Sequence, residues 1–174
     1  EAERFLGAQC DRVRVMPFLD GIPCSIHGIV FDNQVIALRP CEMIVLRQPG
    51  PSKLRYAAAA SFWDPQPADR QVMRETARTV GAHLRERVDY RGVFTVDGVM
   101  TAQGFLPTEL NPRFGAAIGS MTAAIPRLPM YLLHLAIAAR EPLEWRPEAL
   151  ETLILSAADA NRSGRAGTVV QRTI

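Results

Sequence analysis

Residues 108–115 read Thr108-Glu109-Leu110-Asn111-Pro112-Arg113-Phe114-Gly115. In an extended strand, side chains two positions apart point to the same face, so Glu109, Asn111 and Arg113 are expected to project together. Carboxylate and carboxamide oxygens are ligands that Mg²⁺ prefers, and the planar fork of an arginine matches phosphate oxygens. The stretch therefore predicts a site where a magnesium ion meets a polyphosphate.

A second acid lies twelve residues upstream, at the end of an apolar run. That run reads Val93-Phe94-Thr95-Val96-Asp97-Gly98. Its β-branched and aromatic residues are typical of a strand. We expect the two segments to be neighbouring antiparallel strands that bring Asp97 and Glu109 to one metal centre.

The pattern Asp97, then Glu109-x-Asn111-x-Arg113, resembles the metal-binding and catalytic segment of the ATP-grasp enzymes, which include carboxylate–amine ligases and biotin carboxylase. The resemblance covers residues 12–140. It implies that Asp97, Glu109 and Asn111 hold the Mg²⁺ ions (or Mn²⁺) that bridge the phosphates of ATP. It also implies that Arg113 is catalytic and stabilises the phosphorylated intermediate.

Nearer the start, a second segment resembles the hinge with which this family holds adenine. The matching residues are Met16, Pro17, Phe18, Leu19 and Asp20. The family often has acids where this chain has Met16 and Pro23, which leaves Asp20 as the nearest carboxylate for the ribose.

Two arginines further along the chain carry a second expectation. Arg39 and Arg47 flank a predicted strand, where related enzymes have basic residues facing the phosphates or the carboxylate substrate. For each of them a surface ion pair is the alternative.

The chain has the patterning of one α+β domain, an antiparallel sheet with flanking helices, which matches the C-terminal lobe of an ATP-grasp fold. We assign all 174 residues to this domain, with 162–174 as a loose tail. Strands are predicted at 12–19, 25–31, 34–39, 42–47, 92–100 and 104–110, with a turn at Asp32–Asn33 and a short strand at 168–170. A helix is predicted to follow the cap and first-turn signals at 64–67 and to run to Val88, with an apolar stripe formed by Met73, Ala77, Val80, Leu84 and Val88. Helices are also predicted from about Pro129 to Arg140 and from Pro147 to about Asn161.

A complete ATP-grasp ligase also has N-terminal lobes with a glycine-rich loop and lysines that reach the phosphates. This chain has one lysine, Lys53, and no such loop. We therefore expect those lobes to precede Glu1, and we expect the isolated chain to bind ATP weakly and to lack activity. The inner face left without them is expected to be apolar and to favour a homodimer.

Composition argues against several other classes of protein. The net charge of +2 rests on nineteen arginines and one lysine, which does not indicate nucleic-acid binding. No apolar run approaches the ~18–20 residues of a membrane span. The three cysteines lack metal-binding spacing and are typical of reduced thiols in a cytoplasmic protein.

Other single residues receive structural interpretations. His27 is expected to be a strand histidine bonded to the backbone, with a substrate or phosphate contact as the alternative. The run Ala57–Ala60 indicates close packing.

The resemblance implies a ligase in which ATP phosphorylates a carboxylate and an amine displaces the phosphate. One alternative is a non-catalytic nucleotide-binding or interaction module. Another is a biotin-carboxylase or carbamoyl-phosphate type of enzyme that uses bicarbonate. The residues that follow Arg113 disfavour this second alternative, because Phe114-Gly115-Ala116-Ala117 offers no acid to act as the base.

Overall fold

The structure, a computed structural model, describes residues 15–48, 54–123 and 125–160, the backbone of 167–169, and the isolated residues Arg4, Leu6, Gly7 and Arg12. Its centre is a six-stranded sheet in the order β5-β4-β1-β2-β3-β6, in which every neighbouring pair is antiparallel. The strands are β1 (Ile22–Val30), β2 (Val35–Arg47), β3 (Leu54–Ala60), β4 (Gly92–Thr101), β5 (Gly104–Asn111) and β6 (Gly167–Val169).

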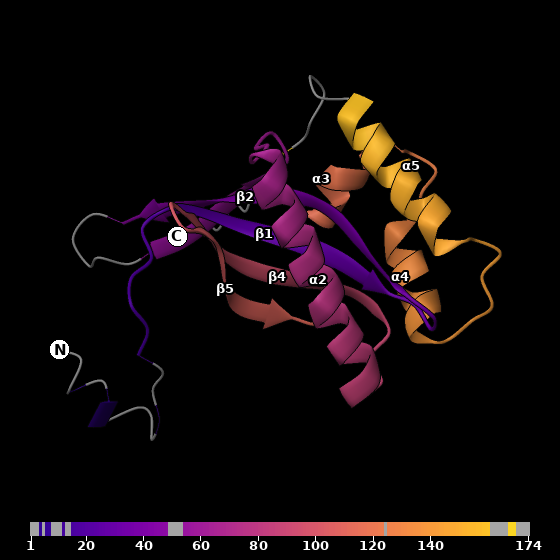
Figure 1. Cartoon of the computed structure of the whole chain (residues 1–174), viewed down its shortest axis with the longest axis horizontal. Coiled ribbons are helices and arrows are strands. Elements are labelled where there is room, and N and C mark those ends of the chain that lie inside the picture. Colours follow the sequence, from indigo (N-terminus) through magenta and orange to yellow (C-terminus); the bar gives the residue numbers. More distant parts are fainter. Residues whose placement is uncertain are drawn as a thin grey trace.

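Helices cover the two faces of this sheet unequally (Figure 1). The helix α2 (Pro67–Val88) lies along one face, over β1 and β2. On the other face, α3 (Ile118–Thr122), α4 (Met130–Ala138) and α5 (Pro147–Ala160) gather toward one end. Alternate residues of β1 show this division, because Ile26 packs with the α2 cluster and Ile29 packs with the α3–α5 cluster.

The sequence predicts α2 almost to the residue. Pro67 occupies the first turn, where its missing N–H costs no helical hydrogen bond. Of the expected apolar stripe, Met73, Ala77 and Leu84 are buried, whereas Val88 in the last turn is 67% exposed. Gly81 completes the buried face, since a Cβ there would lie 2.5 Å from a Val35 methyl group.

The second strand differs from the prediction in length. Residues 34–39 and 42–47 were expected to be two strands, with Pro40 between them, but they form the single strand β2. A β-bulge lies next to Pro40, because the single residue His27 of β1 is opposite two residues of β2, Leu38 and Arg39. Such a bulge interrupts the regular hydrogen-bond ladder and accommodates a proline in a buried strand.

Three further segments differ in how well they agree with the predicted strands. The prediction of a strand over 12–19 is wrong for the described residues 15–19, which have no regular secondary structure. The run Ala57–Ala60 is the buried half of β3, a strand that the sequence did not indicate. The predicted strand near the C-terminus is confirmed as β6, although Val170 lies outside the described residues.

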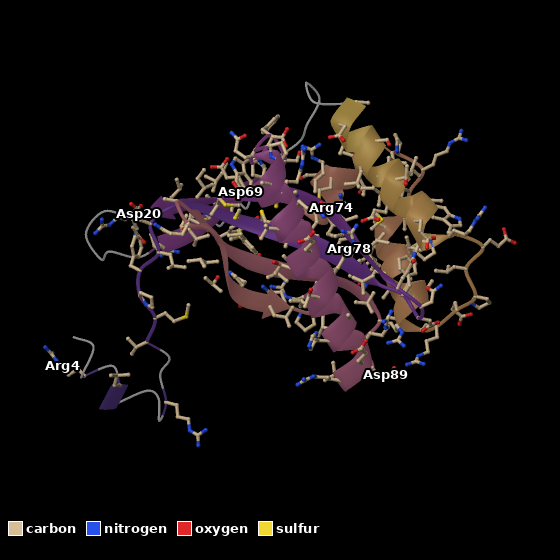
Figure 2. The ribbon with its side chains drawn as sticks, viewed as in Figure 1. Arg4, Asp20, Asp69, Arg74, Arg78 and Asp89 are labelled. Atoms are coloured by element: carbon tan, nitrogen blue, oxygen red, sulfur yellow. The ribbon has the colours of Figure 1, made fainter. Side chains whose placement is uncertain are left out.

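One carboxylate joins both helical layers to the sheet. Glu151 of α5 accepts hydrogen bonds from Arg74 and Arg78 of α2 at 2.8 and 2.7 Å. The same oxygen accepts one from the backbone N–H of Ala37 on β2 at 3.0 Å. Figure 2 shows the two arginines on the side of α2 toward α5. Within the described part of the chain, no helix is long and apolar enough to cross a bilayer.

Candidate active site

The hairpin of β4 and β5 places the two acids opposite each other. Asp97 of β4 is the register partner of Glu109 of β5, and Thr95 is the partner of Asn111. Directly opposed residues in an antiparallel pair have Cβ atoms about 4.5–5.5 Å apart. The expected adjacency of these two strands is confirmed.

Asp97 is held by hydrogen bonds from both neighbouring strands. The Ser25 hydroxyl of β1 donates to its Oδ1 at 2.5 Å, and the Asn111 amide of β5 donates to its Oδ2 at 2.9 Å. The Thr108 hydroxyl donates to its backbone carbonyl at 3.3 Å. The carboxylate therefore has a fixed orientation before any ligand binds.

The surroundings of Asp97 raise its pKa above the ordinary value of 3.8. Burial is the main cause, and the negative charge of Glu109 adds to it. The bond from Ser25, the charge of Arg113 and the bond from Asn111 act in the opposite direction. The site thus holds two acids whose charges are incompletely compensated by the protein.

Arg113 follows the end of β5 and turns back toward it. Its backbone N–H donates to the Asn111 carbonyl at 2.8 Å, and its guanidinium donates to Asn111 Oδ1 at 3.2 Å. The guanidinium is otherwise exposed. Arg113 therefore lies beside Asn111 with donors left over for an anion.

These groups line one cavity of about 340 Å³ on the sheet face opposite α2. Glu109 and Arg113 are exposed, Asp97 and Asn111 are half-buried, and Ser25 is buried. The cavity has its charges near solvent. Its other polar lining residues are His27, Tyr56, Thr95 and Thr108.

The donor set fits a hard divalent cation. Asp97 and Glu109 supply two carboxylates and Asn111 supplies an amide oxygen, and Mg²⁺ is commonly held by one or two carboxylates together with waters and substrate phosphates. The described residues contain no cluster of three or more His, Cys, Asp or Glu side chains suited to a metal.

Two parts of the predicted site are not brought to this cavity. The hinge residues Met16 to Asp20 are described but do not line it, and Phe18 is 82% exposed. Their contact with adenine stays a prediction. Arg39 is 4% exposed and pairs with Asp64 at 2.8 Å and with Asp159. The Asp64 and Asp159 side chains are 26% and 55% exposed, so Arg39 has the ion pairs of the alternative, although the arginine itself is buried. A phosphate contact of Arg39 stays a prediction.

Sequence reasoning missed Ser25 and Thr95 as residues of the cavity, and it gave a site for His27 only as an alternative. Ser25 and His27 alternate on β1 beside Asp97 and Thr95 of β4, in direct register. The alternation Ser25-x-His27 is visible in the sequence. The register that sets it next to Asp97 is not.

Curated relatives of the chain are ligases. No protein-family model matches the chain. Over 96% of its length it is 27% identical to the phosphoribosylamine–glycine ligase of Streptomyces coelicolor, and over 88% of its length it is 28% identical to the ligase of the same name from Mycobacterium leprae. The chain spans only 42% and 39% of the length of these relatives.

A solved structure has the same arrangement of strands and helices. It is N5-carboxyaminoimidazole synthase from Aspergillus clavatus in complex with ADP and 5-aminoimidazole ribonucleotide, with a TM-score of 0.60 and 16% sequence identity. The match covers 81% of this chain and 36% of that one. The chain carries part of the ATP-grasp fold. The fold class predicted from the sequence, an ATP-grasp antiparallel sheet with flanking helices, is confirmed.

Proposed function

We propose that this chain forms the metal- and phosphate-binding part of an ATP- and Mg²⁺-dependent ligase that joins a carboxylate to an amine. The observation that carries the proposal is the pairing of Asp97 with Glu109, with Asn111 and Arg113 in the same cavity. The two relatives support the reaction class, because the name phosphoribosylamine–glycine ligase describes an enzyme that joins an amine to an amino acid. ATP would phosphorylate the carboxylate, and the amine would then displace the phosphate.

The two acids and Asn111 would hold the cation, with Mn²⁺ as a substitute. When bound, the cation neutralises phosphate oxygens and aligns them for transfer. The protein supplies the orientation of the ligands. Ser25 and Asn111 fix the two oxygens of Asp97, so that the carboxylate needs no reorganisation when charge arrives.

Arg113 would stabilise the phosphoryl group or the acyl phosphate. Its guanidinium donates to Asn111, which is itself bonded to Asp97. This chain of contacts ties the position of the cation-binding carboxylate to the position of the anion-binding arginine. A planar guanidinium can donate two parallel hydrogen bonds to two oxygens of a phosphate at once, a geometry that a lysine does not offer.

Adenine recognition is assigned to Met16, Pro17, Phe18, Leu19 and Asp20. Phe18 offers an exposed ring and Met16 an exposed thioether, both suited to stacking on a base. We assign Arg39 a structural role instead, because its ion pairs join β2 to the segment before α2 and to α5.

The partners of the site follow from the same reaction. They are ATP, the carboxylate and amine substrates, and the N-terminal lobes of the same enzyme, with no role for nucleic acid or membrane. The exposed Leu46 and Leu54, on the paired ends of β2 and β3, suit either those lobes or a homodimer. We place the protein in the cytoplasm and treat residues 1–174 as one domain.

A bicarbonate-dependent carboxylase is less compatible with the cavity. The acids among its lining residues are Asp97 and Glu109, which serve the cation. The lining residues after Arg113 are Gly115, Ala116 and Ala117. None of them can act as a base for bicarbonate.

The test is ATP turnover by the full-length protein with a panel of carboxylic acids, each in the presence of hydroxylamine. An acyl phosphate reacts with hydroxylamine to give a hydroxamate, so ADP and hydroxamate are expected to form together and to require Mg²⁺. ADP release with bicarbonate alone would instead identify a carboxylase. Nucleotide binding without turnover of any acid would identify a non-catalytic module.

A matched pair of variants connects the activity to the site. Arg113→Met is expected to lower hydroxamate formation by about 10²-fold, the usual loss for one charge-stabilising group. Arg127→Met, at an exposed position outside the cavity, is expected to retain the parent activity. Equal activity of the two variants contradicts the role of Arg113.

A further inference from the structure

A second polar pair lies one step deeper in the cavity than the acids. His27 of β1 and Thr95 of β4 are register partners, next to the pair formed by Ser25 and Asp97. They are 1% and 5% exposed, and both line the cavity. Beyond them the same face becomes apolar, with Ile29 opposite Val93.

Both residues carry a buried polar atom that the described part of the chain does not satisfy. His27 Nδ1 and Thr95 Oγ1 have no hydrogen-bond partner there. Leaving such a group unsatisfied is unfavourable, and buried polar groups in native proteins are normally hydrogen-bonded. The backbone bond expected for His27 is therefore not formed by Nδ1.

Gly115 determines the space in front of this pair. A Cβ added at Gly115 would lie 2.6 Å from Thr95 Oγ1 and 3.0 Å from His27 Nε2. Any larger residue would therefore press on the Thr95 hydroxyl and on the Nε2 side of the His27 imidazole. With glycine, the backbone packs closely against the pair, and all three residues line the cavity.

The pair differs from the outer part of the cavity in charge. Burial lowers the pKa of His27 to about 4, so its imidazole is neutral at pH 7. Thr95 is also neutral, whereas Asp97, Glu109 and Arg113 carry the charges of the cavity. A phosphate or carboxylate is attracted to Arg113 and the cation, and a neutral hydrogen-bonding group suits the inner pair.

We propose that His27 and Thr95, covered by Gly115, bind the uncharged amine that attacks the activated carboxylate. This rests on the proposed function and adds the location of its second substrate. Successive side chains on one strand face are about 6.6–6.8 Å apart. An amine on the inner pair is thus within a small molecule's length of an acyl group at Asp97. His27 and Thr95 accept its N–H groups and orient its lone pair toward the acyl group.

Binding is tested with hydroxylamine as a neutral amine probe and acetate as an anionic one. The measurement is the NMR spectrum of protein labelled with ¹³C-histidine, in which the three histidines of the chain give few signals. The signal that is missing from the spectrum of His27→Gln belongs to His27. Hydroxylamine is expected to shift the His27 signal saturably, and acetate is not. Gly115→Ala should weaken this binding about tenfold or more, equivalent to one lost contact. Gly119→Ala should not, since a Cβ at Gly119 meets nothing within 4 Å.

Kinetics give a second measurement on the full-length protein. Thr95→Val is expected to raise the KM for hydroxylamine in hydroxamate formation and to leave the KM for ATP unchanged. Thr122→Val is the matched control, because that buried hydroxyl donates within α3. A general effect on folding would change both KM values or appear in both variants.

The two proposals fail separately. An unshifted His27 signal, an equal shift with acetate, or equal binding by Gly115→Ala and Gly119→Ala overturns the amine subsite, even if acids stimulate ADP release. If hydroxylamine binds as expected and no acid stimulates ADP release, the ligase function is wrong and a neutral-amine site remains.

Discussion

Asp97 on β4 is the direct cross-strand partner of Glu109 on β5. Like charges at opposed positions of a sheet are destabilising, and here the charge of Glu109 helps to raise the pKa of Asp97. Folding alone does not favour this arrangement. A divalent cation between the two carboxylates would replace repulsion with attraction, which is the role that the proposed function gives the pair.

Glu109→Gln is expected to remove most of the cation binding. The substitution keeps the size of the side chain and deletes one of the two charges. We expect Mn²⁺ affinity, measured by electron paramagnetic resonance, to fall about tenfold or more, and turnover in the full-length protein to fall ~10²-fold. Glu144→Gln, in the exposed loop before α5, is the control and should bind Mn²⁺ like the parent. Equal affinities of the two variants would place the metal elsewhere.

Asp97→Asn is expected to abolish cation binding without destabilising the fold at pH 7. Because the pKa of Asp97 is raised above 3.8, the folded state binds its proton more tightly than the unfolded state. The contribution of this group to stability is therefore full below pH 3.8 and is lost as the pH rises through the folded-state pKa. At pH 7 a neutral asparagine avoids the cost of an ionised, half-buried acid.

Urea unfolding with and without Mg²⁺ checks this prediction. Asp97→Asn should unfold at the parent midpoint or higher, and Mg²⁺ should stabilise the parent only. Asp69→Asn, in the first turn of α2 (Figure 2), should instead lose about 0.3–1 kcal/mol through the helix dipole and keep the Mg²⁺ effect. A larger loss for Asp97→Asn than for Asp69→Asn contradicts the argument.

Glu151→Gln is expected to destabilise the packing of α5 and α2 on the sheet. One oxygen of Glu151 accepts bonds from Arg74, Arg78 and Ala37. A neutral amide weakens two charge-assisted bonds, so we expect a loss of roughly 2 kcal/mol in the free energy of unfolding. Glu75→Gln, exposed on α2, should stay within about 0.5 kcal/mol of the parent. Equal midpoints in urea would show that the network contributes little.

The sequence contains the information for the hairpin that carries the acids. Alternation on 92–100 and 104–110, together with the spacing of Glu109, Asn111 and Arg113, predicts which side chains share a face. The apolar stripe of α2 is equally local, because helix periodicity depends only on nearby residues. These features required no knowledge of distant contacts.

Features that depend on distant contacts were not predictable. The bulge near Arg39 and the acids that pair with it, Asp64 and Asp159, come from three segments whose meeting is set by the whole fold. β3 was missed because alanine has low strand propensity, and only its neighbours β2 and β6 make it a strand. The place of His27 beside Thr95 depends on the register of β1 with β4 in the same way.

The burial of His27 predicts a loss of stability in mild acid. Its pKa is about 4 in the folded state because burial disfavours the charged imidazole, against 6.5 in the unfolded chain. Between these values the unfolded state binds a proton that the folded state does not, so the free energy of unfolding decreases as the pH falls from 6.5 to 4. The difference of the two pKa values corresponds to about 3 kcal/mol over that window. Above pH 6.5 the group is neutral in both states and contributes no pH dependence.

Urea unfolding at several pH values between 4 and 7 measures this slope. His27→Gln should reduce the slope of the free energy of unfolding against pH by the amount that corresponds to nearly one bound proton. This holds whatever the effect of the substitution on stability at pH 7. His83→Gln, at an exposed position of α2, should keep the slope of the parent. The half-buried His134 has its pKa lowered by burial and acts in the same direction, so some slope should remain in His27→Gln. If His27→Gln and the parent have the same slope, the imidazole of His27 is not buried in its neutral form. The pair of His27 and Thr95 is then not the neutral pair that the amine subsite requires.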